Sequence, residues 1–358
     1  RAPEVPTLAV VLHAGALSVF NNERGFSEAE VRALCDLGAS TKSSAKPSAR
    51  PRSGAIGRKG LGFKSVFCVS AAPCVLSNGF SFSLGGDERA GGAGEPYGGS
   101  EESPFSAIVP LWVEPAAVAR RLARAPDSGT AFFLPLRAGQ PPPPLEAPEE
   151  ETLLFLRRLR RVELLWPGEG GAVAGVRLTR LPDEEWAVGS GLVRARVLRE
   201  ELCGGTLAAP ATAGRALCEF ALLRLRLLVR GQTTELTLAF DAAPSPERRP
   251  RPLFAWLPVC HAGLPFALNA DFSLVASRQA LHDDEWNAAL RDALPAALLG
   301  AARRERWLRE RLGSWLPRPH ECIDAWWRPA FDTLAEGARG EALILTEEGR
   351  WVEPRHAL

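Results

Sequence analysis

Three closely spaced glycines, Gly57, Gly60 and Gly62, are the residues of this sequence best suited to bind a ligand. They lie in the stretch Ile-Gly-Arg-Lys-Gly-Leu-Gly-Phe-Lys-Ser-Val-Phe, residues 56–67, which follows a basic, serine-rich segment. Glycine permits positive φ and lets the backbone come close to a bulky ligand. Backbone amides aligned at the start of a helix attract anions, phosphates above all. The stretch therefore predicts a phosphate site, with a plain glycine-rich turn as the alternative.

Two well-known phosphate motifs use the same residue types, and each fails at one position. A Walker loop requires Lys directly after its last Gly, but Phe63 stands between Gly62 and Lys64. A dinucleotide fingerprint requires a third Gly where this sequence has Ser65. The remaining pattern is G-x-x-G-x-G-F-K-S, which disfavours a Walker-type kinase or NTPase.

The composition indicates a folded protein with more than one domain. The chain has 358 residues, of which 46% are hydrophobic and 24% charged, and this length holds two or three domains. There are 43 Lys and Arg against 42 Asp and Glu, and the net charge of +1 argues against a general nucleic-acid binder. The sequence shows no apolar run long enough to cross a membrane and no signal peptide.

The cysteine pattern points to reduced thiols. There are seven cysteines, an odd number, with no C-x-x-C pair and no zinc-like spacing to the five histidines. We therefore expect an intracellular protein, cytoplasmic or nuclear, without a metal site. Methionine is absent and the first residue is Arg1, so we expect a fragment of a longer protein or an incomplete gene model.

The first part of the sequence predicts short strands interleaved with helices. Residues 8–20 are typical of a two-stranded hairpin, and Ser27 with Glu30 forms a capping box for a helix that ends at Gly38. Residues 38–55 have no apolar period and predict a mobile loop or a plain solvated linker. Asn78-Gly79 is a hairpin turn within residues 74–84. We also expect a helix start or strand at 63–69, a glycine-rich insertion at 85–103, strands at 108–113 and 130–136, and a short helix at 115–124.

A proline-rich linker, residues 138–150, separates this part from the rest. An amphipathic helix with a solvated or acid-paired basic face is expected at 151–165. Antiparallel-type strands are expected at 173–180, 186–198, 217–229, 235–240, 253–259 and 266–274, followed by a helix at 285–312 broken near Pro295, a helix at 322–334 and a hairpin at 342–352. We predict an α+β chain with domains at 1–137 and 151–300 and a helical segment with a hairpin at 301–358.

Three segments of the sequence form an ordered set. They are the turn at 21–26 after a strand, the glycine stretch after a flexible loop, and Ser128-Gly129-Thr130 at the start of a strand. In this order they resemble the ATP-binding domain of the GHKL superfamily, which includes gyrase, the ninety-kilodalton heat-shock chaperone, histidine kinases and MutL. Within it, Asn-Asn-Glu-Arg-Gly-Phe-Ser at 21–27 and the stretch at 56–67 look like NO VEIN-like modules, with sacsin-like proteins more distant. The resemblance implies a two-layer α/β sandwich followed by a second α+β domain.

The resemblance also implies ATP with Mg²⁺ as the ligand. In this superfamily an acidic residue at the strand-end turn accepts a hydrogen bond from the adenine amino group; Asn21 stands there, and its oxygen can still accept. Glu23 replaces one glycine of that turn, and Gly25 keeps the other. The other residues that the resemblance assigns to the lid, the phosphates or the adenine are Ser40, Thr41, Lys42, Gly57, Gly60, Leu61, Gly62, Phe63 and Thr130.

The superfamily's catalytic helix has no counterpart in the sequence. It carries a glutamate that activates water and an asparagine that holds magnesium, and we expect it upstream of Arg1. The catalytic residues are therefore unknown, and any ATPase activity is expected of the full-length protein only. In the second domain Arg278 is a candidate sensor of the γ-phosphate, or it pairs with Asp283 or Asp284.

The leading hypothesis is an ATP-binding module in which nucleotide closes the lid at 38–55. The alternative is a non-catalytic scaffold or protein-interaction domain that kept the fold; Asn21 and the helix expected upstream favour it, whereas the glycine stretch favours nucleotide binding. We expect an adenine nucleotide as the partner, and neither a membrane nor a nucleic acid. The sequence does not identify a protein partner.

Overall fold

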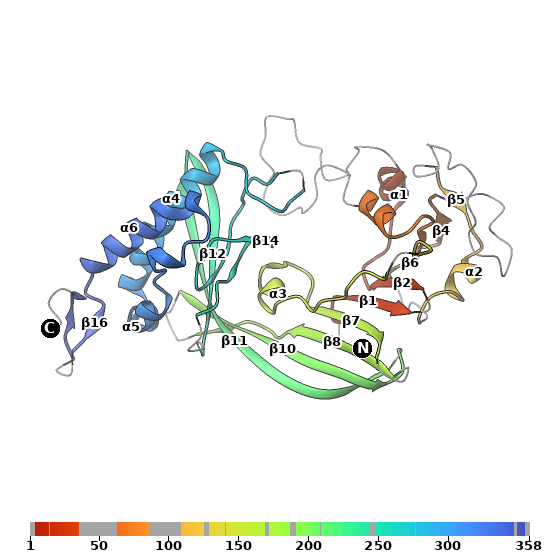
Figure 1. Ribbon diagram of the computed structural model, residues 1–358, viewed down its shortest axis with the longest axis horizontal. Helices are drawn as coiled ribbons and strands as arrows, with labels where there is room; N and C mark the ends of the chain where they lie inside the picture. The colour runs from red at the N-terminus through yellow and green to blue at the C-terminus, as the bar shows by residue number, and fades with distance from the viewer. Residues whose placement is uncertain are drawn as a thin grey trace. The chain divides into compact units, whose positions relative to one another are not determined.

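The chain forms two compact units, each assembled from three segments (Figure 1). Unit 1 contains Arg1–Pro148, Arg158–Thr179 and Leu198–Ala216, and unit 2 contains Glu149–Arg157, Arg180–Val197 and Leu217–Leu358. The computed structural model describes residues 4–13, 15–35, 63–85, 109–124, 129–139, 141–168, 172–186, 191–207, 209–243, 248–275, 277–346 and 349–354.

The sheet of unit 1 is organised around a hairpin. β1 (Thr7–His13) and β2 (Ala16–Asn21) pair antiparallel, and Gly15 has the positive φ that their tight turn requires. On the far side of β1 lies β7 (Arg161–Pro167), which pairs with it in parallel. The strand order in unit 1 is β11 (Pro210–Val229), β10 (Leu192–Gly205), β8 (Val173–Arg180), β7, β1, β2, β6 (Thr130–Pro135), β3 (Cys74–Ser77), β4 (Phe80–Ser83) and β5 (Leu111–Trp112).

Short helices pack on the two faces of this sheet, because apolar residues alternate along its strands. On one face, Val118 of α2 (Pro115–Ala119) joins a cluster with Ala9 and Phe20. The other face carries Val75 and Phe82, which cluster with residues of α1 (Glu28–Cys35) and of the 3₁₀ helix η1 (Phe63–Cys68). The face occupied by α1 and η1 is the one on which the candidate site is built.

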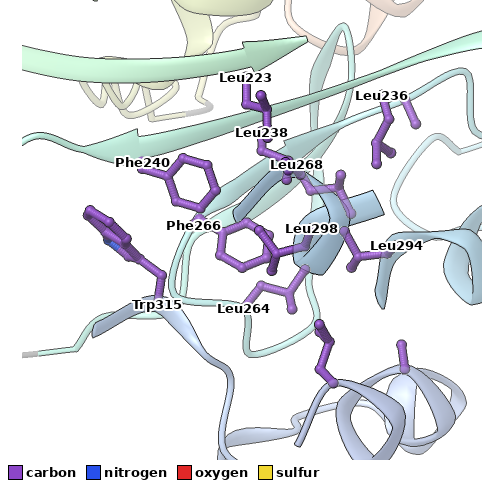
Figure 2. Close-up of a cluster of buried hydrophobic side chains, with 14 of the residues drawn as sticks. Leu223, Leu236, Leu238, Phe240, Leu264, Phe266, Leu268, Leu294, Leu298 and Trp315 are labelled. Carbon is purple, nitrogen blue, oxygen red and sulfur yellow. The ribbon is translucent and has the colours of Figure 1, made fainter. Parts of the chain in front are cut away.

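Unit 2 holds the largest apolar cluster described in the chain (Figure 2). Phe240 lies 5.3 Å from Phe266 and 5.1 Å from Trp315, measured between ring centroids. The strands are β9 (Glu184–Glu185), β12 (Gln232–Asp241), β13 (Pro252–Ala255), β14 (Leu257–His261), β15 (Ala267–Asn269) and parts of β10 and β11. The helices are α3 (Glu151–Phe155), α4 (Glu285–Arg304), α5 (Arg306–Trp315), α6 (Arg328–Arg339), η4 (Pro319–Glu321) and η5 (Ala325–Trp327), with a small hairpin of β16 (Ile344–Leu345) and β17 (Trp351–Val352).

Several sequence predictions are confirmed. The α+β class holds, the hairpins at 8–20, 74–84 and 342–352 form, and the strands at 130–136 and 173–180 are present. The capping box forms as predicted, since the Ser27 backbone N–H donates to Glu30 at 2.8 Å. Asn78 and Gly79 both have positive φ, as a two-residue turn between β3 and β4 requires. All seven cysteines are free thiols.

The helix predicted at 151–165 is wrong. α3 ends at Phe155, Leu156 is extended, and Arg161–Pro167 forms the strand β7. The arginines of this stretch recur at a helical spacing, but Val162, Glu163, Leu164 and Leu165 are all buried because β7 lies between β1 and β8. A strand buried on both faces shows no alternation, which explains the error.

Other boundaries also differ from the predictions. α4 continues through Pro295 and the break comes at Glu305, because the buried residues Leu290, Leu294 and Leu298 pack that face into the core and offset the cost of an internal proline, about 3 kcal/mol. The strand predicted at 253–259 is two strands, β13 and β14, joined at Trp256. The strand predicted at 186–198 begins later, at Leu192, and the helix predicted at 115–124 ends at Ala119.

The units are also less contiguous than the predicted domains. Residues 158–179 and 198–216 belong to unit 1 although they follow the proline-rich linker. The reason is the pairing of β7 with β1 and of β8 with β7. Within the described segments, no helix is both long and apolar enough to cross a membrane.

Candidate functional site

The candidate site lies where β2, β6 and β3 end side by side. Asn21, the last residue of β2, is paired with Thr130, the first residue of β6, and Thr130 is paired with Ser77, the last residue of β3. Three polar residues from distant parts of the sequence therefore meet at one edge. Asn21 and Thr130 are predicted site residues, and the structure brings them together.

A relay of hydroxyl groups connects this edge to the turn at 21–26. Thr130 Oγ1 donates to Glu23 Oε1 at 3.0 Å, and Ser77 Oγ lies 2.6 Å from Thr130 Oγ1. Since the Thr130 proton goes to the carboxylate, Ser77 must donate to Thr130. Ser77 in turn accepts from the Phe26 N–H at 2.8 Å. Ser77 and Thr130 are almost fully buried, so the relay fixes the turn on the sheet.

Two glycines let the turn fit closely against the strand ends. Gly129 has a φ of +84°, and a Cβ there would lie 2.1 Å from the backbone oxygen of Asn21. Gly25 has a φ of +81°, and its Cβ would lie 2.7 Å from Asn78 Cβ. Neither position tolerates a side chain without displacing its neighbour. Gly25 is therefore required by the packing of the turn, and its role at a nucleotide stays a prediction.

Asn21 and Asn22 are neighbours in sequence but differ in how their amides are held. Asn22 Oδ1 accepts from the Thr7 N–H at 2.7 Å, and its Nδ2 donates to the Val5 carbonyl at 2.8 Å. Asn21 Oδ1 is buried, and no described residue donates a hydrogen bond to it. A buried acceptor without a donor costs about 1–3 kcal/mol, so a ligand or water that supplies one would be bound favourably.

Phe63 begins η1 and packs over the same edge. Its ring centroid lies 5.8 Å from that of Phe132, and Phe26 lies 6.2 Å from Phe132 on the same cluster. Phe132 lies two residues along β6 from Thr130, the partner of Asn21, so Phe63 is held near these two residues. Arg137, which follows the opposite end of β6, donates to the Phe67 carbonyl at 3.1 and 3.3 Å and holds the far end of η1.

The remaining predicted site residues fall in two groups. Ser40, Thr41, Lys42, Gly57, Gly60, Leu61 and Gly62 lie outside the described residues. Arg278 belongs to unit 2, has a φ of +62°, and its Nη2 lies 3.5 Å from the Ala255 carbonyl oxygen. Its alternative partners are engaged elsewhere, since Asp283 accepts from Trp326 and Asp284 caps α4. Its role at a phosphate stays a prediction.

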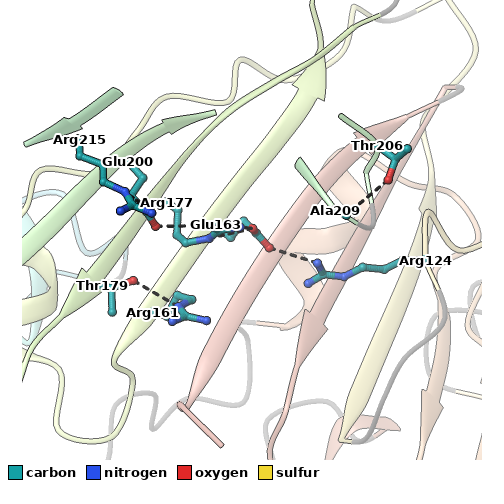
Figure 3. Close-up of polar contacts among 9 residues, drawn as sticks. All are labelled: Arg124, Arg161, Glu163, Arg177, Thr179, Glu200, Thr206, Ala209 and Arg215. Carbon is teal, nitrogen blue, oxygen red and sulfur yellow. Dashed lines mark hydrogen bonds and ion pairs between the residues drawn. The ribbon is translucent and has the colours of Figure 1, made fainter. Parts of the chain in front are cut away.

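A buried ion-pair chain in unit 1 is a structural feature rather than a second site (Figure 3). Glu163 is held by Arg124 at 3.1 Å and by Arg177 at 2.6 Å, and Glu200 is held by Arg177 at 3.3 Å and by Arg215 at 3.0 Å. Both carboxylates are buried and each meets two guanidinium groups, so neither is available as an acid or base. These ion pairs link β7, β8, β10 and β11.

Sequence reasoning missed two members of the site. Ser77 is 53 residues from Thr130 along the chain, and only its place before Asn78-Gly79 marks it as a strand-end residue. Glu23 was noted as the replacement of a glycine, but the sequence does not show that its carboxylate meets Thr130. Such a contact depends on the register between β2, β6 and β3.

No protein-family model matches the chain. The chain is similar to protein NO VEIN of Arabidopsis thaliana, with 30% identity over 335 residues that cover 83% of this chain and 10% of that protein. It therefore spans about a tenth of the length of this relative. The predicted likeness to NO VEIN is confirmed, and it extends over most of the chain.

Proposed function

We propose that the chain is the ATP-binding module of a NO VEIN-like, chaperone-type protein with the GHKL fold. The observation that carries the proposal is the buried Asn21 Oδ1, which lacks a donor among the described residues. It stands at the strand end where the resemblance places the acceptor for the adenine amino group. Adenine would supply the N–H that the described chain does not.

The phosphates belong, on this proposal, to the glycine stretch. The backbone would approach the phosphates closely at three glycines, Gly57, Gly60 and Gly62. Leu61 and Phe63, which stand next to these glycines, would belong to the same site. The contact of Phe63 with Phe132 supports this, because Phe132 lies two residues along β6 from Thr130, the partner of Asn21. Ser40, Thr41 and Lys42 would line the entrance of a lid that closes over the nucleotide.

Mg²⁺ would accompany ATP, since it binds mainly through phosphate oxygens and water. It supplies charge neutralisation at the phosphates. No residue of this chain is assigned to hold the ion or to activate water, so the proposal covers binding and not hydrolysis.

A non-catalytic scaffold is the second candidate, and one observation favours it. The Thr130 hydroxyl, which the resemblance places near adenine, is fully buried and already donates to Glu23. A turn that supplies its own carboxylate in this way can be stable without a nucleotide. The experiment below separates the two candidates.

The test is calorimetric titration of the chain with Mg²⁺–ATP, for the parent and for Asn21→Leu. Leucine keeps the volume but removes the acceptor, and we expect binding about tenfold weaker, equivalent to about 1.4 kcal/mol. Glu28→Gln is the control, since this carboxylate is exposed and pairs with Arg32 on the surface of α1. No binding by the parent favours the scaffold; equal affinity of parent and Asn21→Leu contradicts the role of Asn21.

A further inference from the structure

The amide of Asn21 differs from a carboxylate in what it can offer a ligand. A carboxylate at this place only accepts hydrogen bonds, whereas an amide carries one accepting and one donating end. The one carboxylate of the turn, Glu23, is already engaged by the Thr130 hydroxyl. Asn21 is therefore the side chain left at the strand end to contact a base.

The structure also does not fix which end of this amide points to the ligand. Asn22 cannot turn its amide over without losing hydrogen bonds to Thr7 and Val5. The fully buried Asn287 is held in the same way, by Ser273 and His282. By contrast, no described residue donates to Asn21 Oδ1, and the terminal torsion of Asn is broad and roughly two-fold. The Asn21 amide can therefore turn over without breaking a hydrogen bond from a described residue to its oxygen.

We infer that the base site accepts both adenine and guanine nucleotides, with Asn21 as the residue that sets this tolerance. The inference rests on the proposed function, because it assumes that Asn21 meets the base. Adenine presents an amino donor at position 6 beside an acceptor at N1, and Asn matches it with Oδ1 and Nδ2. Guanine presents an oxygen at position 6 beside an N1–H donor, and the same amide turned over matches that pair equally well.

An aspartate at this position would behave differently. With its two oxygens facing position 6 and N1, a carboxylate accepts one hydrogen bond from either base and opposes one lone pair, that of adenine N1 or that of the guanine oxygen. A buried acceptor left without a donor costs about tenfold in affinity or more. Asn21→Asp should therefore weaken the binding of ATP and of GTP alike.

The experiment compares the dissociation constants of Mg²⁺–ATP, Mg²⁺–GTP and inorganic triphosphate for the parent and for Asn21→Asp. We expect ATP and GTP to bind the parent within about tenfold of each other and more tightly than triphosphate. In Asn21→Asp both nucleotides should bind at least about tenfold more weakly, while the affinity for triphosphate stays unchanged. Circular dichroism of both proteins checks that the variant is folded; if it is not, the parent's ratio alone decides.

The outcomes separate this inference from the proposed function. ATP binding with GTP excluded more than about a hundredfold by the parent overturns the inference and leaves the proposed function in place. Unchanged affinities for both ATP and GTP in folded Asn21→Asp overturn the role of Asn21. Binding of ATP no tighter than triphosphate shows that no base is recognised and overturns the inference, and absence of any nucleotide binding overturns the proposed function itself.

Discussion

Two asparagines, one in each unit, show how the same side chain serves different purposes. In unit 2, Asn287 is fully buried; its oxygen accepts from the Ser273 N–H and its nitrogen donates to the carbonyls of Ser273 and His282. In unit 1, the buried oxygen of Asn21 has no donor among the described residues. The saturated amide ties a loop to α4, whereas the unsaturated one has capacity left for a ligand. The two asparagines therefore differ in how many of their hydrogen-bonding groups are satisfied within the described residues, although the residue type is the same.

The largest effect is expected from removing the saturated amide. Asn287→Leu leaves three backbone groups without their partner, and we expect unit 2 to lose about 3 kcal/mol of unfolding free energy. Tryptophan fluorescence in a denaturant titration reports on this unit, because of the ten tryptophans only Trp112 and Trp166 belong to unit 1. Leu228→Ala, at a side chain 76% exposed, is the control and should change stability by less than about 0.5 kcal/mol. A loss no larger than the control's would contradict the structural role.

The next effect tests the strand-end turn of unit 1. Gly129→Ala combines an unfavourable φ with a contact to the Asn21 backbone, and we expect a cost of about 2 kcal/mol or more. Gly79→Ala is the matched control: Gly79 has nearly the same φ, but a Cβ added there would meet no atom of the described residues within 4 Å, and the change should cost about 1 kcal/mol. Hydrogen exchange of the β2 and β6 amides measures both. Equal losses of unfolding free energy in the two variants would show that only the φ of Gly129, and not its contact with Asn21, disfavours a side chain there.

A smaller effect of opposite sign is expected at the unsaturated amide. Without nucleotide, Asn21→Leu removes a buried acceptor that has no described donor, and unit 1 should become more stable by about 0.5–1 kcal/mol. The same hydrogen-exchange measurement applies. A loss of about 2 kcal/mol instead would make Asn21 a structural residue like Asn287 and would remove the basis of the comparison.

The smallest effect concerns a partly buried histidine of β1. His13 Nε2 lies 2.7 Å from Ser18 Oγ, which also accepts from the Ala123 N–H. Burial lowers the pKa of His13 below its usual 6.5. As the pH falls through 6.5 the unfolded chain takes up the proton first, so stability is complete above this pH and declines below it.

His13→Gln removes this titration while other groups titrate in both proteins alike. The difference in stability between the parent and His13→Gln should therefore be constant above pH 7 and shift against the parent as the pH falls from 6.5 towards 5. Exchange of the β1 and β2 amides at several pH values measures it. A difference independent of pH would show that the ring does not titrate differently on folding.

Local signals predicted local structure well. The Asn-Gly turn between β3 and β4 and the Ser27–Glu30 capping box involve residues at most a few positions apart, and both formed as expected. Of the candidate site, the sequence identified Asn21, Gly25 and Thr130, which lie in short recognisable segments, and the structure pairs Asn21 with Thr130. The contacts of Ser77 and Glu23 with Thr130 could not be predicted, since they depend on strand register across 53 and 107 residues.

The failures have a common physical cause. The basic spacing of residues 157–161 favours a helix, but β7 is decided by its pairing with β1, whose residues lie far upstream. Pro295 ends helices in isolation, yet burial of Leu294 and Leu298 keeps α4 continuous. In both places tertiary burial outweighs local propensity, which a sequence read segment by segment cannot weigh.

The parallel pairing of β1 with β7 has a consequence for how the chain is made. β1 ends at His13 and β7 begins at Arg161, so at about 5–20 residues per second a ribosome spends about 7–30 s between them. Throughout that time β1, with the sequence Thr-Leu-Ala-Val-Val-Leu-His, has an unpaired edge rich in aliphatic side chains. Such an edge pairs readily with other chains. Nascent or truncated chains that stop before Arg161 should therefore aggregate or engage chaperones, because β1 acquires its second partner only after β2 to β6 have been synthesised.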